Sequence, residues 1–224
     1  MKNELVAKAL EQGRKILDEF ESKALLRSYG IPVVDESACT TEKEALAACV
    51  KIGYPVVMKS LSSKISHKTE RGLVKIGVKD KKEAAAAFKE IKKGSGEDFD
   101  RVLVQRMVSG KRELVAGLTT DQQFGPVVMF GLGGIFTEVL KDVSFRVAPF
   151  DKKDAMEMME EIKAKKILGA VRGMPEADRD TLASLLVALG TIGMEIPEIK
   201  EIDMNPVILE GSSPVVVDAL VILK

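Results

Sequence analysis

The sequence predicts an α+β fold made of two lobes. Segments with strand and helix patterns occur in mixed order, and several pairs of strand-like segments are joined by turns alone. This order differs from the regular strand–helix alternation of a doubly wound parallel sheet. The weakest structural signal falls near Val108–Lys111, where Ser109-Gly110 follows a strong strand pattern. We therefore expect an N-terminal lobe of residues 1–108 and a C-terminal lobe of residues 109–224.

The N-terminal lobe is expected to begin with one long helix over residues 3–29. Apolar side chains recur there at roughly helical spacing, at Leu5, Ala9, Ile16, Phe20 and Leu26. Gly30 and Pro32 end the pattern. Thr41, with Glu44 three residues later, is typical of the N-cap of a second helix. The other expected elements of this lobe are strands over 31–37, 55–60, 73–78 and 101–108 and helices over 42–52 and 81–93.

The C-terminal lobe is expected to be richer in strands. A polar turn at Asp121 separates its first two strands, and a glycine-rich turn, GLGG at 131–134, follows them. Glycines at this density expose backbone amides that suit anions, although a plain turn explains them equally well. The spacing is not G-x-G-x-x-G, which argues against a dinucleotide site of the Rossmann type. The expected elements are strands over 113–119, 126–132, 145–150, 201–209 and 215–223 and helices over 151–170 and about 175–193.

The composition excludes some classes of partner. The 34 Lys and Arg residues balance the 34 Asp and Glu residues, so no overall basic field favours nucleic acid or an anionic membrane. The apolar C-terminal stretch is about half of a membrane span and is interrupted by Asp218. The N-terminus lacks the apolar core of a signal peptide. Cys39 and Cys49 are expected to be free, buried thiols, as suits a cytoplasmic protein.

Lys59 and the loop after it are candidates for phosphate chemistry. Lys59 ends the apolar run PVVMK, where its ammonium could lie against a nucleotide phosphate. The alternative is a strand-end lysine in solvent. The following loop, SSKISHKTERG, offers hydroxyl groups and contains His67, the only histidine in the chain. Its spacing is not that of the G-x-x-x-x-G-K-[ST] phosphate loop. Taken alone, His67 is better explained as a solvated loop residue.

The segment EIDMNP is a candidate magnesium site. Glu201, Asp203 and Asn205 share one face of a strand because they are two residues apart. Their oxygen donors suit magnesium that also carries phosphate ligands. Asp218 interrupts the apolar run VVVDALV, and a buried carboxylate is costly unless it is paired or coordinated. If the two strands pair antiparallel, Asn205 and Asp218 can meet at one metal. The alternative is a solvent-facing acidic edge.

Two further residues have equally open interpretations. Arg146, in FRVAPF, is a candidate phosphate clamp, and its alternative is a surface ion pair. Glu113 opens a strand just past the expected hinge, where a carboxylate could accept hydrogen bonds from ribose hydroxyls. Its alternative is an ordinary strand end at the surface.

In their order and spacing, these segments resemble the ATP-grasp domain of the ADP-forming acyl-CoA synthetases. The resemblance runs through nearly the whole chain and rests on YGIPV, EALAACVKIGYPVVMKSLSSKISHKTERG, FGPVVMFGLGGIFTEVLKDVSFRVAPF, EIDMNPVIL and VVVDALV. The size is similar to that of a free-standing β subunit of acetate-producing members. One departure is Arg71-Gly72, where the family usually has two glycines after the histidine loop.

The resemblance implies an ATP-grasp fold, in which two α+β lobes hold ATP between them, and it implies roles for individual residues. Asn205 and Asp218 would hold Mg²⁺, with Asp203 near the transferring phosphoryl group and Arg146 steadying it. His67 would carry that group as a phosphohistidine. The nucleotide itself would be contacted by Lys59, Gln105, Arg106, Met107, Val108 and Glu113.

The implied protein is the nucleotide-binding β subunit of an ADP-forming acetate (acyl)–CoA ligase. With a CoA-binding α subunit, in an α2β2 assembly, it would convert acyl-CoA, ADP and phosphate to acid, CoA and ATP. Acyl and CoA recognition would belong mostly to that partner. One alternative is the nucleotide lobe of a succinate–CoA ligase, against which His67 and the lack of a longer C-terminal domain count. The other is a non-catalytic ATP-sensing module of an acyltransferase, against which the joint presence of Lys59, His67, Asn205 and Asp218 counts.

Overall fold

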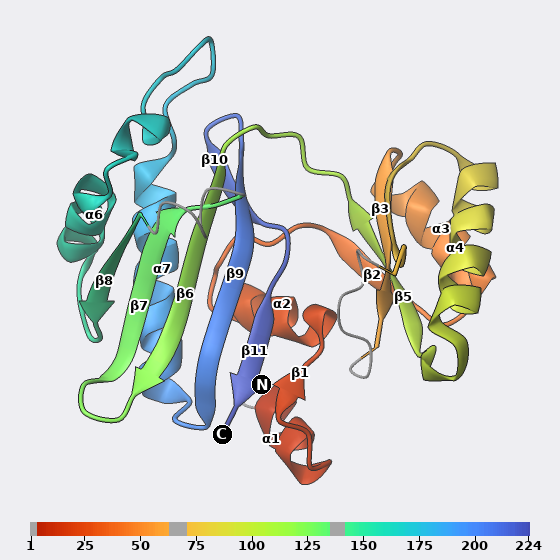
Figure 1. Ribbon diagram of the computed structural model, residues 1–224, viewed down its shortest axis with the longest axis horizontal. Helices are drawn as coiled ribbons and strands as arrows, with labels where there is room; N and C mark the ends of the chain where they lie inside the picture. Colours follow the sequence, from red (N-terminus) through yellow and green to blue (C-terminus); the bar gives the residue numbers. More distant parts are fainter. Residues whose placement is uncertain (1–3, 63–70, 135–141) are drawn as a thin grey trace. The chain divides into compact units, whose positions relative to one another are not determined.

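A computed structural model describes residues 4–62, 71–134 and 142–224 and divides the chain into two compact units. The larger unit contains Met1–Val33 and Val108–Lys224, and the smaller contains Val34–Met107 (Figure 1). The expected N-terminal lobe of 1–108 is therefore corrected. Its first 33 residues belong to the larger unit, because the strand Ile16–Leu17 pairs with the last strand of the chain.

The smaller unit is a four-stranded antiparallel sheet covered on one face by two helices. The strand order is β2-β5-β3-β4. Its elements are β2 (Glu36–Cys39), α3 (Glu42–Ile52), β3 (Val56–Leu61), β4 (Val74–Val78), α4 (Lys81–Ser95), a short 3-10 turn (Gly96–Asp98) and β5 (Arg101–Arg106). The predicted cap of α3 is confirmed, since Thr41 Oγ1 accepts from Glu44 N and the Glu44 carboxylate accepts from the Thr41 backbone. Side chains such as Met58 and Val104 pack against α3 and α4.

The larger unit is a seven-stranded sheet with helices on one face. The strand order is β1-β11-β9-β6-β7-β8, and β10 also pairs with β9. Its helices are α1 (Glu4–Glu11), α2 (Glu19–Ser28), α6 (Lys152–Glu161), a 3-10 turn (Lys165–Leu168) and α7 (Arg179–Glu195). Its strands are β1 (Ile16–Leu17), β6 (Glu113–Asp121), β7 (Gly125–Leu132), β8 (Val143–Val147), β9 (Ile199–Glu210), β10 (Ser213–Val216) and β11 (Leu220–Leu223).

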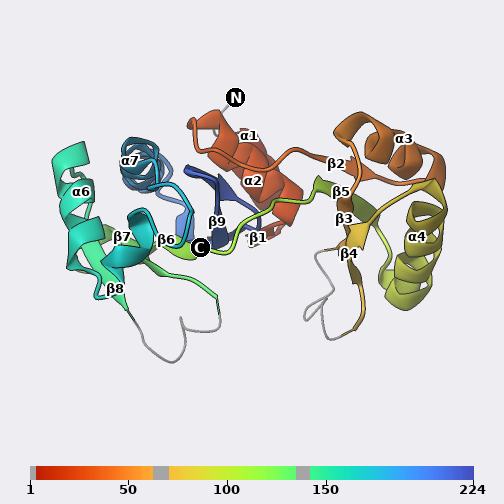
Figure 2. The ribbon, with the colours of Figure 1, turned by 90° about the horizontal axis from the view of Figure 1, so that it is seen from above.

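The four helices that the structure describes in the larger unit lie on the same face of its sheet (Figure 2). One buried apolar cluster joins them to the strands, with contributions from α2 (Leu25), α6 (Met158), α7 (Leu186) and β9 (Ile202). Because side chains alternate along a strand, the residues between these buried positions point to the opposite face, which these helices do not cover. The sheet therefore packs one face against the core and leaves the other face uncovered by these helices. The mixed helices and sheets confirm the expected α+β class.

Several expected elements are shorter than predicted, and the strand expected over 31–37 is observed as β2, at Glu36–Cys39. The helix over 3–29 is wrong: Gly13, at φ +67°, ends α1, and β1 intervenes before Asp18 starts α2. The helix over 151–170 ends at Glu161, because the Asp142 carboxylate accepts from the backbone N–H groups of Lys163 and Ala164. The strand expected over 215–223 is two strands, β10 and β11, separated by three irregular residues.

Candidate functional site

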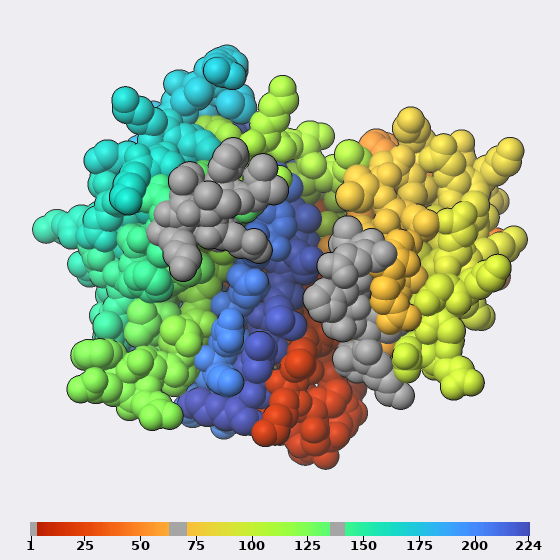
Figure 3. Space-filling model, in the orientation of Figure 1, coloured from red at the N-terminus to blue at the C-terminus, as the bar shows by residue number. Residues whose placement is uncertain are grey.

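The three polar residues of β9 do share one face. Ile202 and Met204 are buried against the helices, whereas Glu201 and Asn205 are exposed and Asp203 is half-buried. This alternation confirms the prediction and directs the three polar side chains away from the core. The space-filling view shows atoms of β9, in blue, at the surface of the larger unit (Figure 3).

Asp218 lies opposite Asn205. The ladder between β10 and β9 pairs Val216 with Val207, and the ladder between β11 and β9 pairs Leu220 with Asp203. The register is the same on both sides of the break, so residue 218 faces residue 205. The N–H of Val217 also donates to the Pro206 carbonyl across the break, at 3.1 Å. Side chains directly opposite each other in an antiparallel pair have Cβ atoms about 5 Å apart.

One expectation about Asp218 is wrong. The sequence predicted a buried carboxylate within a continuous strand, but Asp218 is half-buried and lies in the irregular residues between β10 and β11. The interruption of the apolar run is therefore an interruption of the strand itself. It leaves the carboxylate partly open to solvent beside β9, where an ion and its water ligands could reach it.

Electrostatics at these residues favour a cation. Burial raises the pKa of Asp203, and the negative charges of Glu201 and Asp218 raise it further. A bound cation would offset that repulsion. Over residues 4–62, 71–134 and 142–224, no group of three or more His, Cys, Asp or Glu side chains could hold a metal. The donors here are two carboxylates and one amide, and magnesium commonly takes one or two carboxylates with water and substrate phosphates. The residues present thus fit magnesium arriving with a nucleotide.

Arg146 does not join this group. Arg146 pairs with Val128, which lies across β6 from Leu118 and thus in line with Ile202 of β9. That row of side chains faces the helices, so Arg146 is on the opposite face from Asp203 and Asn205. Its guanidinium makes a bidentate ion pair with Glu161 of α6, at 2.9 and 2.5 Å. The structure therefore shows the alternative, a surface ion pair.

Glu113 lies beside the glycine-rich turn. Its carbonyl accepts from Gly133 N at 2.8 Å, and a Cβ added at Gly134 would lie 3.0 Å from its carboxylate. A Cβ at Gly131 would lie 2.5 Å from the Asp142 carbonyl. Glycine is therefore needed at these positions because neighbouring chain segments approach closely. This agrees with the structural explanation of GLGG and leaves Glu113, which is half-buried, at the start of β6.

Two of the expected nucleotide contacts, Lys59 and Gln105, lie on one face of the sheet of the smaller unit. Lys59 alternates with Met58, which packs against the helices, so its side chain points to the face that α3 and α4 do not cover. Lys59 is only 6% exposed, so the alternative of a strand-end lysine in solvent is wrong. Gln105 shares this face and is buried. Arg106, Met107 and Val108 follow and are half-buried.

His67 lies outside the described residues, so its role stays a prediction from the sequence.

Two buried cations were not predicted from the sequence. Arg112 donates to four backbone carbonyls, of Ile167, Gly169, Pro175 and Gly211. Lys23 of α2 is fully buried beside Glu19. The only sequence signal for Lys23 was an oppositely charged residue four positions earlier, which usually marks an exposed helix face.

Comparison with known proteins identifies the family to which the chain belongs. The family model for the ATP-grasp domain matches residues 8–223. The β subunit of acetate–CoA ligase [ADP-forming] I from Pyrococcus furiosus is 45% identical over 98% of this chain and 97% of its own length. The chain belongs to the ATP-grasp family of ADP-forming acetate–CoA ligase β subunits. The fold predicted from the sequence is confirmed.

Two other members of this ligase family are informative. The acetate–CoA ligase [ADP-forming] I of Archaeoglobus fulgidus is 40% identical over 98% of this chain, which spans 33% of that longer protein. A solved structure of dinucleotide forming acetyl-coenzyme A synthetase 1 from Ca. Korarchaeum cryptofilum is 42% identical, with a TM-score of 0.91 and full coverage of both chains. It holds coenzyme A and Mg-AMPPCP, with its phosphohistidine segment pointing towards the nucleotide binding site.

None of the helices within the described residues is both long enough and apolar enough to cross a lipid bilayer.

Proposed function

We propose that this chain is the nucleotide-binding β subunit of an ADP-forming acetate–CoA ligase. The complete enzyme converts acyl-CoA, ADP and phosphate to acid, CoA and ATP, reversibly. This chain performs the last step, the transfer of a phosphoryl group from His67 to ADP. The observation that carries the proposal is the face of β9 that carries Asp203 and Asn205, with Asp218 in the break opposite Asn205, in a chain 45% identical to such a subunit.

His67 carries the phosphoryl group in the proposed reaction. Neutral imidazole is a competent nucleophile near pH 7, and its bond to phosphorus is labile. In the forward step, a terminal oxygen of ADP attacks phosphorus, a new P–O bond forms, and the P–N bond to His67 breaks. The imidazole leaves as a neutral ring when its other nitrogen carries the proton. The phosphoryl group passes to ADP without free phosphate being formed.

Positioning and charge neutralisation supply most of the catalysis of such a transfer. Lys59 binds nucleotide phosphates as a point charge. Asn205 and Asp218 would hold magnesium, which would neutralise charge on the phosphate oxygens. Asp203, on the same face of β9, would lie near the transferring group. The backbone from Gln105 to Val108 lies along the adenine, and Glu113 accepts hydrogen bonds from the ribose. Arg146 has no part in this assignment, because it faces the helices.

A partner completes the reaction. The chain supplies residues for nucleotide and metal, and we assign CoA binding to an α subunit in an α2β2 assembly. The matched family member is itself named a β subunit. The two cysteines of this chain are free and buried, which is consistent with a reducing cytoplasm as the site of the enzyme.

Labelling with ATP tests the proposal. With ATP carrying a labelled γ-phosphate and Mg²⁺, the purified chain should acquire an acid-labile, base-stable label. The single histidine makes the assignment clean, because any phosphohistidine must be His67. His67→Asn should abolish the label and leave ATP binding intact, and we expect a stability change within about 0.5 kcal/mol.

The same experiment separates the alternatives. A non-catalytic ATP-sensing module would bind ATP and show no label in either form.

A second experiment uses the complete enzyme. In it, His67→Asn should still let acyl-CoA and phosphate phosphorylate the α subunit, because that step lies upstream. ATP formation at a near wild-type rate by this variant would show that the partner delivers the phosphoryl group directly, and His67 would then be an ordinary loop residue.

A further inference from the structure

Lys23 is a charged side chain in a fully buried position. It is 0% exposed, and its ammonium lies 2.9 Å from the Glu19 carboxylate, one turn earlier on α2, which is 6% exposed. Burying an ion pair removes two charges from water, and replacing such a pair by apolar side chains often leaves stability unchanged or raises it. Stability alone therefore gives little reason for a lysine at this position. A second contact of its ammonium indicates another reason.

The ammonium of Lys23 also donates to the carbonyl of Val217, at 3.1 Å. Val217 is the residue directly before Asp218, in the irregular residues between β10 and β11. The N–H of Val217 is bonded to Pro206 of β9, so both polar groups of this peptide residue are held. Lys23 of α2 thus binds the peptide group that joins Val217 to Asp218, the candidate magnesium ligand. Pro206 of β9 binds the N–H of the same valine.

Ser22, which precedes Lys23, and Pro32 also bind the backbone on either side of Asp218. The Oγ of Ser22 accepts from Val221 N at 3.2 Å, and the carbonyl of Pro32 accepts from Val216 N at 2.9 Å. The residues before and after Asp218 are therefore bonded to the N-terminal segment of the chain. Irregular backbone has no ladder of its own to fix it, so its conformation depends on such bonds.

We propose that Lys23 is a positioning residue of the magnesium site: by holding the Val217 carbonyl, it fixes the backbone that presents Asp218 opposite Asn205. This inference rests on the proposed function, which makes Asp218 a metal ligand. Groups that orient a ligand from behind typically change metal affinity by roughly 10- to 100-fold when they are removed. Glu19 holds the ammonium in place and neutralises it, so the pair acts as one unit.

The test measures how Mg²⁺ promotes ADP binding to the full chain. ADP affinity is measured by calorimetry over a series of MgCl₂ concentrations and without metal. Lys23→Met should raise the Mg²⁺ concentration for half-maximal enhancement roughly tenfold or more. ADP affinity without metal should be unchanged, and saturating Mg²⁺ should restore wild-type affinity. A residue with a purely structural role would not separate the metal dependence from nucleotide binding in this way.

Matched variants keep the test decisive. Lys8→Met removes an exposed lysine from α1 and should leave the Mg²⁺ dependence as in the wild type. The double variant Glu19→Met/Lys23→Met avoids an unpaired buried carboxylate and should show the same tenfold shift. A folded double variant with the wild-type Mg²⁺ dependence would overturn the inference, and so would failure of both Lys23 variants to fold, judged by circular dichroism. If the wild type itself binds ADP with no Mg²⁺ dependence, the proposed function fails instead.

Discussion

Asp203 is a carboxylate whose environment disfavours its own charge. Burial raises its pKa, and the neighbouring carboxylates Glu201 and Asp218 raise it further. A folded-state pKa above the unfolded value means that the folded state binds more protons in the interval between the two. The associated stability is fully present below the unfolded pKa and is lost as the pH rises through the folded pKa. The buried negative charge of such a residue lowers the stability of the fold, and a bound cation would offset the repulsion between the carboxylates.

Asp203→Asn should therefore make the chain more stable and less active. At pH 7 we expect its free energy of unfolding to exceed that of the wild type by up to about 1 kcal/mol, because the amide carries no charge to bury. The difference should disappear below the unfolded pKa of aspartate, where both side chains are neutral. Urea unfolding at several pH values checks this. Equal stability of the two proteins at pH 7 would contradict the electrostatic account.

Asp218 should matter for metal binding more than for folding. It is half-buried and lies outside the regular strands, so Asp218→Asn should change stability by no more than about 0.5 kcal/mol. Because the amide is a weaker ligand than the carboxylate, Mg²⁺-dependent ADP binding should weaken by roughly tenfold or more and labelling of His67 should nearly cease. An unchanged Mg²⁺ dependence in the folded variant would remove Asp218 from the metal site.

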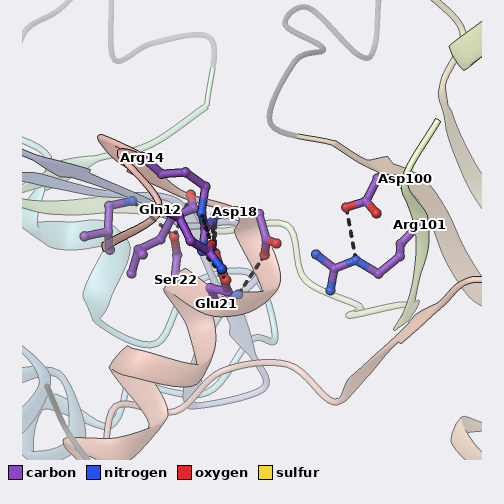
Figure 4. A network of polar contacts seen from close by, with 9 residues as sticks. Gln12, Arg14, Asp18, Glu21, Ser22, Asp100 and Arg101 are labelled. Atoms are coloured by element: carbon purple, nitrogen blue, oxygen red, sulfur yellow. Dashed lines mark hydrogen bonds and ion pairs between the residues drawn. The ribbon is translucent and has the colours of Figure 1, made fainter. Parts of the chain in front are cut away.

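At the scale of elements, the start of α2 determines where the N-terminal segment reverses direction. Asp18 accepts from Glu21 N at 2.9 Å, and Glu21 accepts from Asp18 N at 3.0 Å, which completes a capping box. The Glu21 carboxylate also pairs with both terminal nitrogens of Arg14, at 2.7 and 2.9 Å. Figure 4 shows these side chains, with Gln12 and Ser22, around the first turn of the helix. The cap defines the first turn of α2, the helix that carries Lys23.

Asp18→Ala should destabilise the larger unit by about 1 kcal/mol, the usual effect of losing an N-cap. The denaturant midpoint should fall with little change in the slope of the transition, because the same surface is exposed on unfolding. Thr41→Ala, at the cap of α3, is the matched variant in the smaller unit. A wild-type midpoint for Asp18→Ala would mean that packing alone defines the start of α2.

At the scale of the whole molecule, the chain contains two units with separate apolar cores. Each sheet is covered by helices on one face and carries candidate ligand-binding residues on the other, with Lys59 and Gln105 in the smaller unit and Asp203 and Asn205 in the larger. We assign nucleotide and metal binding to residues of this chain, and acyl and CoA recognition to a partner. Because acyl and CoA recognition is assigned to a partner, the isolated chain is expected to lack the overall reaction.

The purified chain alone should form no acyl-CoA from acid, CoA and ATP. It should still bind ADP with Mg²⁺ and become labelled by ATP. The complex co-purified from the native source is the positive control and should synthesise acyl-CoA in the same assay. Robust synthesis by the isolated chain would show that CoA and acid sites lie within these 224 residues.

The sequence by itself determined the features that depend on neighbouring residues. The cap at Thr41 and the length of α3 follow from side-chain-to-backbone bonds three residues apart. The shared face of Glu201, Asp203 and Asn205 follows from the two-residue period of a strand. The ordered series of motifs was enough to indicate the ATP-grasp fold. All of these signals are local, or are patterns of local signals, and can be read along the chain.

Only the tertiary structure decided features that depend on pairing between distant segments. The N-terminal 33 residues belong to the larger unit because β1 pairs with β11, at the other end of the chain. Arg146 faces the helices because the registers of three neighbouring strands set its side, and a shift of one residue would reverse it. Lys23 is buried because α2 packs on the residues around Asp218. Register and burial are set by contacts between residues far apart in sequence. The periodic pattern of neighbouring residues does not reveal such contacts.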